Sequence, residues 1–187
     1  MLSLLCIAFI LRRLPVTGKL AIRIEMTTSQ SDLIRSAFGR FATGVTIVTS
    51  VGPDGGNVGM TASSFNSVSL DPPMILWSAG TQASEYDVFT SCTRFAVHVL
   101  SESQTDLSNR FATPGIDKFD GVGWKLSSNK LPVLDGCPLC LQCETVARHQ
   151  VSDHIILIGQ VVDVDFSSEE PPLLYFGSAY YQLGDSI

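Results

Sequence analysis

Two long segments of strand-forming residues, separated by only two residues, constrain the fold of this chain most strongly. Leu139–Val151 and His154–Phe166 are both predicted to be strands. In the second, hydrophobic residues alternate with aspartates over 162–166, the pattern of a half-buried strand. Strands this close in sequence pair antiparallel, because a parallel pair needs a long crossover connection. The sheet of this protein is therefore expected to be antiparallel.

The rest of the chain supplies shorter strands and a few helices. The strands are predicted at Val45–Val51, Gly59–Phe65, Met74–Ala79 and Phe95–Leu100, with a hairpin turn at Pro53–Gly56. A helix capped by Ser31 or Asp32 and ended by Gly44 should cover the core with its apolar face. Shorter helices are predicted at Gln82–Phe89 and Glu102–Ala112. Five or six strands with helices only as covers favour a mainly β protein, an antiparallel Greek-key-type barrel.

Charge and hydropathy exclude two classes of partner. The 187 residues carry a net charge of −6, and the body of the chain has no basic stripe that could hold a phosphate backbone, so no nucleic acid is expected. The apolar run Leu2–Leu11 is too short to span a membrane. We predict an N-terminal extension at 1–26, with the native protein beginning near Met26, one domain at 27–187 and a cytoplasmic location.

Several familiar catalytic motifs do not occur in the sequence. There is no Gly-x-Gly-x-x-Gly turn between a strand and a helix, so a Rossmann nucleotide site is disfavoured. Neither a Gly-x-Ser-x-Gly elbow nor a His-Glu-x-x-His helix is present, which removes the usual anchors of hydrolases and metalloproteases.

Cys137, Cys140 and Cys143 have a spacing that three thiolates around one metal ion could share. A fourth ligand is difficult to find, because neither Cys92 nor His149 completes a known pattern. We therefore predict no metal site and interpret the cysteines as small apolar residues that fill space in a strand. A metal protein remains the alternative.

The segment Thr61–Ser64 is unusually rich in small hydroxyl residues. Small side chains let a planar ligand approach the backbone, and hydroxyls can both donate and accept hydrogen bonds. The alternative is a strand whose serines simply face solvent.

Three neighbouring runs of sequence carry a resemblance to a known family. The runs are 38–49 (FGRFATGVTIVT), 59–65 (GMTASSF) and 67–73 (SVSLDPP), and the likeness extends over about 32–183. Together they resemble the flavin reductase-like domain family, the short-chain reductases that serve flavin monooxygenases. The resemblance implies an FMN-binding split barrel and a homodimer, with the flavin near the subunit interface.

The resemblance also implies which residues hold the cofactors. It assigns flavin contacts to Thr61–Ser64, and ribityl and phosphate contacts to Ser78 and Ser84; Ser84 would also cap the short predicted helix at a phosphate site. The complete set of predicted cofactor-binding residues is Thr46, Thr61, Ala62, Ser63, Ser64, Ser78, Ser84 and Asp153.

By the same resemblance, His154 would lie beside the nicotinamide and position it for hydride transfer. The family often has Gly-Asp-His here, whereas this chain has Ser152 in place of the glycine. The alternative for His154 is a partly exposed loop histidine. His98 and His149 are interpreted as structural strand residues.

Two other features leave alternatives open. Phe111, Phe119 and Trp124 could cover a ligand or form a small hydrophobic cluster. The ending Tyr180–Leu183 departs from the Tyr-Arg type of ending in the family, which puts C-terminal contacts to the cofactor or the dimer partner in doubt.

The hypothesis for function is an NAD(P)H:flavin oxidoreductase that reduces FMN or FAD and supplies it to a flavin-dependent monooxygenase. The alternatives are a flavin-binding sensor or carrier without reductase activity and, less well matched, an oxidase of the pyridoxamine phosphate type.

Overall fold

A computed structural model describes residues 28–167 and 169–186. The predicted extension at 1–26 lies outside the described residues. The main sheet is antiparallel throughout and has the strand order β3-β2-β6-β9-β10-β5-β4. Its strands, in chain order, are β2 (Thr46–Val51), β3 (Asn57–Ala62), β4 (Asn66–Leu70), β5 (Pro73–Gly80), β6 (Arg94–Val99), β9 (Leu139–Val151) and β10 (His154–Phe166).

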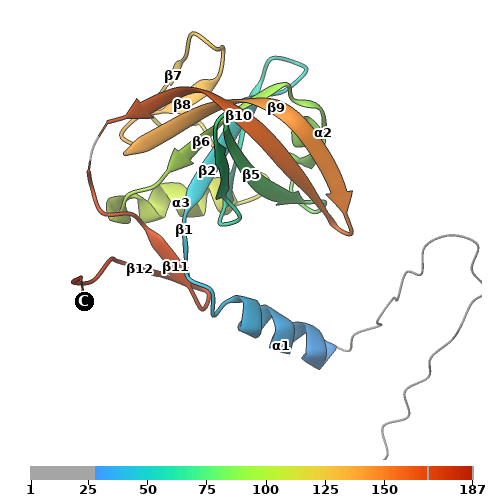
Figure 1. Ribbon diagram of the computed structural model, residues 1–187, viewed down its shortest axis with the longest axis vertical. Helices are drawn as coiled ribbons and strands as arrows, with labels where there is room; N and C mark the ends of the chain where they lie inside the picture. The colour runs from blue at the N-terminus through green and yellow to red at the C-terminus, as the bar shows by residue number, and fades with distance from the viewer. Residues whose placement is uncertain (1–27, 168, 187) are drawn as a thin grey trace, which may run out of the picture.

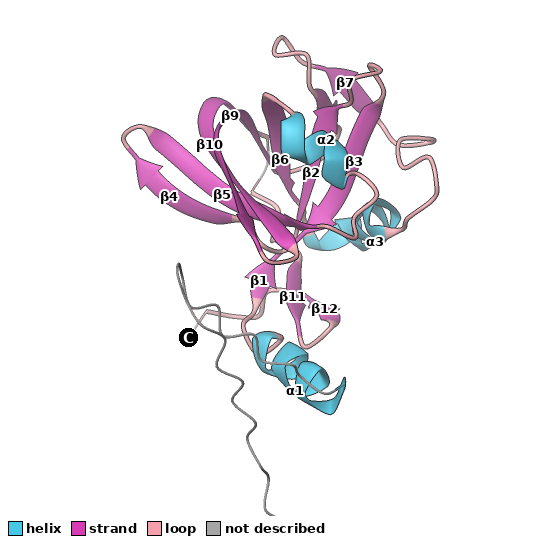
Figure 2. Cartoon of the chain, turned by 90° about the vertical axis from the view of Figure 1, so that its right-hand side faces the viewer, coloured by secondary structure: helices cyan, strands magenta, loops and turns pink. Residues whose placement is uncertain are grey.

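The two edge strands of this sheet, β3 and β4, are consecutive in the sequence. Only Ser63, Ser64 and Phe65 join them, so the sheet must curl until its two edges lie close together. No ladder of backbone hydrogen bonds is formed between the described residues of β3 and β4. The result is a barrel that is split between these strands (Figures 1 and 2), which confirms the predicted fold class.

The barrel interior is filled by large side chains from several strands. Trp77 of β5 packs edge-on against Phe89 and Phe95, with ring centroids 4.8 and 5.9 Å away, and all three are fully buried. A second cluster lies around Ile47, Leu100 and Phe111. The core therefore fixes both faces of β2 and the inner face of β5.

The predicted bounds of β9 and β10 are confirmed, and these strands pair from Leu139 to Phe166 with two irregularities. The predicted half-burial of the end of β10 is wrong. Val162, Val164 and Phe166 are exposed. Within the part of the chain that the structure describes, nothing covers this apolar stretch.

The helices are short and lie outside the sheet: α1 (Thr28–Phe38), α2 (Tyr86–Ser91), a 3-10 turn at Glu102–Gln104, and α3 (Thr105–Ala112). The first helix begins and ends earlier than predicted, and it does not cover the core. It projects from the barrel (Figure 1), and Leu33 and Phe38 are 69% and 76% exposed. None of the helices in 28–167 and 169–186 is long and apolar enough to cross a membrane.

Two small sheets were not predicted from the sequence. One has the order β1-β11-β12 and comprises Thr43–Gly44, Leu174–Phe176 and Ala179–Tyr181. It lies between the barrel and α1 (Figure 2). The other pairs β7 (Trp124–Leu126) with β8 (Pro132–Leu134). Strands of two or three residues leave too short a pattern to be recognised.

Candidate functional site

Several of the predicted site residues meet at the C-terminal end of β5. The Ser64 hydroxyl accepts a hydrogen bond from the Ser78 N–H at 2.9 Å and donates one to the Ser78 carbonyl at 3.0 Å. On the other side of β5, the register places Ile156 of β10 opposite Ser78 and His154 opposite Gly80. Paired residues point to the same face of a sheet, so Ser78 and His154 share the outer face of the barrel.

The Ser64 hydroxyl takes the place of a neighbouring strand. β4 pairs with β5 only as far as Leu76, and beyond it the edge of β5 would be left without partners. The Ser64 side chain satisfies both backbone groups of Ser78 at that point. Ser64 is therefore part of the barrel structure, and its hydroxyl proton is used in the hydrogen bond to the Ser78 carbonyl.

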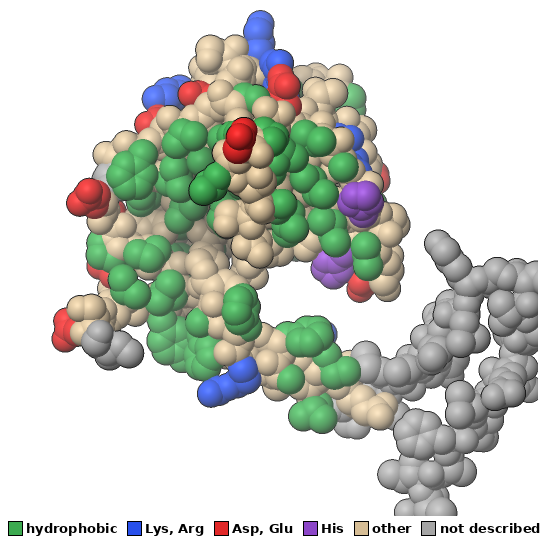
Figure 3. Space-filling view, in the orientation of Figure 1, with side chains coloured by type: hydrophobic (Ala, Val, Ile, Leu, Met, Phe, Trp, Pro, Cys, Tyr) green, Lys and Arg blue, Asp and Glu red, His purple; other side chains and the backbone are tan. Residues whose placement is uncertain are grey.

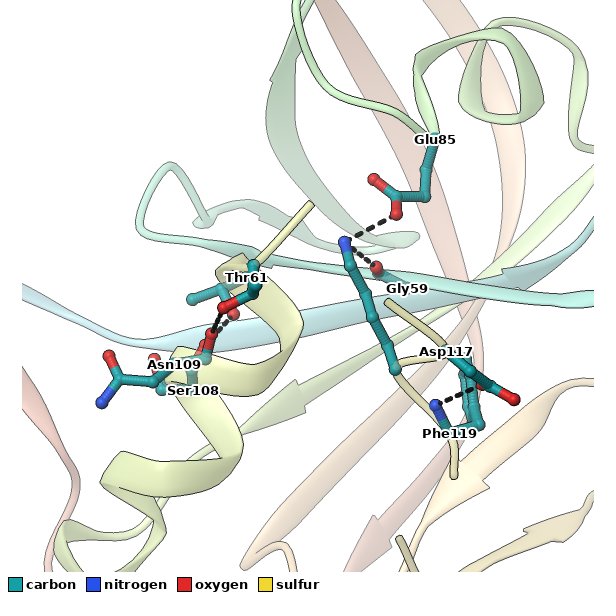
Figure 4. Close-up of polar contacts among 9 residues, drawn as sticks. Gly59, Thr61, Glu85, Ser108, Asn109, Asp117 and Phe119 are labelled. Atoms are coloured by element: carbon teal, nitrogen blue, oxygen red, sulfur yellow. Dashed lines mark hydrogen bonds and ion pairs between the residues drawn. The ribbon is translucent and has the colours of Figure 1, made fainter. Parts of the chain in front are cut away.

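Two other predicted contact residues, Thr46 and Thr61, also use their hydroxyl protons in hydrogen bonds within the protein. Thr46 is only 2% exposed and donates to the Ala62 carbonyl at 2.7 Å. Thr61 donates to the Ser108 carbonyl of α3 at 2.6 Å (Figure 4). These residues can still offer a ligand a lone pair of the hydroxyl oxygen, or the N–H and C=O groups of their backbone.

The backbone of β3 does have a free edge. The Gly59 carbonyl accepts a hydrogen bond from Lys118 Nζ at 3.1 Å, so it points away from β2 (Figure 4). Backbone groups two residues apart in a strand point the same way, which directs the N–H and C=O of Thr61 to that same open edge. One donor and one acceptor are thus presented beside the bend at Ser63.

The predicted strand Gly59–Phe65 ends early, because β3 stops at Ala62 and Ser63–Ser64 form a bend. Ser63 is exposed and Ser78 is half-buried. Around the bend, the side chains of Ala62, Ser63 and Ser78 are all small. This donor set, two serine hydroxyls and backbone amides beside small side chains, fits the polar edge of a flat heterocycle.

Ser84 is not a helix cap, so that part of the prediction is wrong. α2 starts at Tyr86, its N-cap is Glu85, and no side chain caps it. Ser84 lies in the preceding turn and is exposed. The chain needs the turn at 81–85 to leave β5, which delays the helix by four residues relative to the predicted start.

His154 and Asp153 form a close pair at the turn between β9 and β10. His154 Nδ1 lies 2.9 Å from Asp153 Oδ1, and both side chains are accessible. The hydrogen bond from His154 lowers the pKa of Asp153. With the carboxylate accepting from Nδ1–H, the Nε2 lone pair is left to face a ligand.

The other two histidines, His98 and His149, were interpreted from the sequence as structural strand residues, and they lie in β6 and β9. His98 is completely buried, donates from Nδ1 to the Ile47 carbonyl at 3.1 Å and accepts from the Leu134 N–H at Nε2. Burial lowers its pKa to about 4. His149 is exposed near the end of β9.

A buried ion pair near the free edge of β3 was missed by the sequence analysis. Lys118 is 8% exposed, and its Nζ lies 2.6 Å from Glu85 Oε1. Figure 4 shows the lysine amine reaching both Glu85 and the Gly59 carbonyl. No signal in the sequence joins a lysine in a loop to a glutamate so far away along the chain.

Three aromatic residues, Phe111 of α3, Phe119 of the loop before β7 and Trp124 of β7, pack one against the next. Phe111 and Phe119 are edge-on at 5.2 Å, and Phe119 and Trp124 at 5.9 Å. Phe111 is fully buried, whereas Trp124 is 39% exposed. The structure thus favours the hydrophobic cluster for Phe111 and Phe119 and leaves only Trp124 open to a ligand.

The three closely spaced cysteines lie in three different clusters of the core. Cys137 packs with Leu100, Cys140 with Val133, and Cys143 with Phe95. Burial raises their pKa values to about 11, 12 and 12, so the thiols stay protonated. Among the described residues, no group of three or more metal-ligating side chains is assembled. The space-filling interpretation accounts for these positions.

Comparison with known proteins decides the family. Residues 38–184 match the family described as "Flavin reductase like domain". The chain belongs to the flavin reductase-like domain family. FMN reductase (NADH) SmoA of Agrobacterium fabrum is 41% identical over 146 residues, which are 78% of this chain and 82% of the relative. The predicted family is confirmed.

Two further flavin reductases extend the comparison. The reductase component of flavin-dependent trigonelline monooxygenase from Acinetobacter baylyi is 41% identical over 148 residues, 79% of this chain but only 47% of that longer protein. The solved structure of the NADH:FAD oxidoreductase SgcE6 of Streptomyces globisporus C-1027, in complex with NAD and FAD fragments, aligns with a TM-score of 0.78 and 32% identity over 86% of this chain and 98% of that chain. The predicted enzyme class, a flavin reductase, is confirmed.

Proposed function

We propose that this chain oxidises NADH or NADPH, reduces FMN or FAD at the end of β5, and supplies the reduced flavin to a separate monooxygenase component. The observation that carries the proposal is the meeting of the Ser63–Ser64 bend, Ser78 and His154 on one outer face of a flavin reductase barrel. A cytoplasmic location and a single domain at 27–187 belong to the same proposal.

The flavin would be held by the bend between β3 and β4 and by the edges beside it. The backbone of Thr61 and the hydroxyls of Ser63 and Ser78 supply donors and acceptors, while the Ala62 side chain packs into the barrel core beneath them. Thr46 and Ser64 would act indirectly, because their hydroxyls hold the neighbouring backbone in place. When bound, the flavin supplies the redox chemistry by accepting a hydride from the nicotinamide.

His154 would hold the nicotinamide against that ring. Its Nδ1–H is donated to Asp153, so Nε2 can accept a hydrogen bond from an amide such as a carboxamide. Asp153 would act through His154 by fixing the ring. Hydride transfer does not require His154 or Asp153 to move a proton. Both side chains can therefore be accessible to solvent, as they are here.

The composition of the site suits a flavin that is released after reduction. The eight residues predicted to bind it include Asp153 but no lysine or arginine that could form a strong fork with a phosphate. Hydroxyl and backbone contacts give moderate affinity, and release is what a monooxygenase partner requires. The trigonelline enzyme is a relative whose reductase is one component of such a system.

The same proposal includes a homodimer, formed through apolar surface that the barrel does not use. Leu33, Phe38 and Phe41 are exposed around α1, as are Val162, Val164 and Phe166 on β10. Figure 3 shows hydrophobic side chains gathered over the barrel face and over the projecting helical segment. An isolated helix of eleven residues is marginal in water, so α1 needs a surface to pack on. A second copy of the chain supplies one.

Steady-state oxidation of each nicotinamide with each flavin tests the proposed reaction. Purified protein should oxidise NADH or NADPH only when FMN or FAD is added, with saturation in both. Flavin binding without turnover of either nicotinamide would instead indicate a carrier or sensor, and absence of both would refute the proposed site.

A further inference from the structure

The turn that carries His154 contains a strained residue. Ser152 and Asp153 are the two residues between β9 and β10, and Ser152 has a φ of +53°. At this φ, a residue with a Cβ is less stable than in an ordinary conformation, whereas glycine adopts it freely. This is also the position where the family often has glycine, so the turn in this chain needs another source of support.

Two hydrogen bonds supply that support, one from Tyr86 to Gln150 and one from Gln150 to Ser152, and together they are called the brace. The Gln150 amide donates from Nε2 to the Ser152 carbonyl at 3.0 Å. The Tyr86 hydroxyl, at the start of α2, donates to Gln150 Oε1 at 2.6 Å. Both the donor and the acceptor of the Gln150 amide are thereby used. The carbonyl of Ser152 is connected through Gln150 to Tyr86 of α2.

The remaining contacts of the turn lead directly to His154. The Thr81 N–H donates to the Asp153 carbonyl at 2.8 Å, and Asp153 Oδ1 accepts from His154 Nδ1. On the other side, the imidazole lies over Gly80 of β5. A Cβ added to Gly80 would be only 3.3 Å from His154 Nε2. The ring is therefore held between a carboxylate and a glycine that leaves room for it.

We propose that Tyr86 and Gln150 are positioning residues for His154. They hold the left-handed Ser152 turn in the geometry that lets Asp153 orient the imidazole over Gly80. The proposal rests on the proposed function for its catalytic meaning, because His154 is the group assigned to the nicotinamide. The effect of the brace on the His154 ring can be tested separately from its effect on the reaction.

The test compares Gln150→Ala, Tyr86→Phe and the control Gln160→Ala, an exposed glutamine on the same hairpin. The ¹⁵N chemical shifts of the His154 ring should show Nδ1 protonated in the unaltered protein and a loss of that preference in Gln150→Ala. The KM for NADH should rise about 3- to 10-fold in Gln150→Ala, as expected for the loss of the hydrogen bond to the Ser152 carbonyl, with kcat, the flavin Kd and the melting temperature little changed. Tyr86→Phe should act in the same direction, and Gln160→Ala should change nothing.

A second-site change makes the test specific. Adding Ser152→Gly to Gln150→Ala should restore the ring signals and the KM, because glycine adopts this turn without a brace. Unchanged His154 signals in Gln150→Ala, or no rescue by Ser152→Gly, would overturn the inference. If the ring signals change and are rescued while the KM for NADH stays constant, the brace stands and the role assigned to His154 is what fails.

Discussion

His98 is held inside the barrel in its neutral form. Its Nδ1–H donates to the Ile47 carbonyl, its Nε2 accepts from the Leu134 N–H, and burial lowers its pKa from 6.5 to about 4. The unfolded chain takes up a proton near pH 6.5, whereas the folded chain does not until about pH 4. Folding stability should therefore fall by about 3 kcal/mol from this group as the pH drops through that window, and be unaffected above it.

Urea unfolding measured from pH 7.5 to pH 4 checks this prediction. His98→Gln should lower stability at neutral pH but reduce the acid-side slope by about one proton, or ~1.4 kcal/mol per pH unit. His149→Gln, the same replacement at an exposed strand end, serves as the matched control. Equal slopes in the His98 variant and the original protein would contradict the assignment.

At the same scale, the sequence could indicate candidate site residues but not the hydrogen-bond partners of their hydroxyl groups. Thr46, Thr61 and Ser64 were predicted as ligand contacts, and the structure commits each hydroxyl proton to a carbonyl of the barrel. Those carbonyls belong to Ala62, Ser108 and Ser78. Such pairings depend on how the strands are placed in space, and residue type alone does not contain them.

The loop before β7 is fastened to the barrel by the Lys118–Glu85 pair. Both side chains are largely buried, and the amine also binds the Gly59 carbonyl. Lys118→Met should destabilise the protein by about 3 kcal/mol or more, because it leaves the Glu85 carboxylate buried without a partner. Adding Glu85→Leu should recover much of this loss, since an apolar pair can replace a buried ion pair.

Denaturant unfolding of these variants has a natural control in the same protein. Arg94 and Glu144 form an ion pair at 2.7 Å whose side chains are about half exposed. Arg94→Met should cost less than about 1 kcal/mol because solvent screens this pair. A Lys118→Met variant no less stable than Arg94→Met would show that the buried pair does not fasten the loop.

Elements were predictable in proportion to the length of their patterns. The bounds of β9 and β10 could be predicted because thirteen residues of strand character were bounded by a two-residue turn. The start of α2 could not, because the turn at 81–85 depends on how β5 leaves the sheet. β11 and β12, of three residues each, exist only through their pairing with each other and with β1.

At the scale of the whole molecule, Leu33, Phe38 and Phe41 expose large hydrophobic side chains around α1, which is typical of an interaction surface. The apolar periodicity of this helix predicted a face buried against the barrel, and the structure instead leaves that face exposed. In the proposed dimer, a second copy of the chain would cover it. We expect a dimer in solution, measured by light scattering at micromolar concentration. Phe38→Asp with Phe41→Asp should produce a monomer, whereas Ser36→Asp, at another exposed position of α1, should remain dimeric. A monomeric unaltered protein would contradict the proposed interface.

In the proposed reaction, the outer face at the end of β5 brings the nicotinamide to the flavin through His154. The most direct test is anaerobic rapid mixing of the flavin-loaded protein with NADH, in the unaltered protein and in His154→Ala. Flavin should bind both proteins with similar Kd. The rate of flavin reduction at subsaturating NADH should fall at least tenfold in His154→Ala, which corresponds to about 1.4 kcal/mol of lost positioning. An unchanged reduction rate in His154→Ala would contradict it.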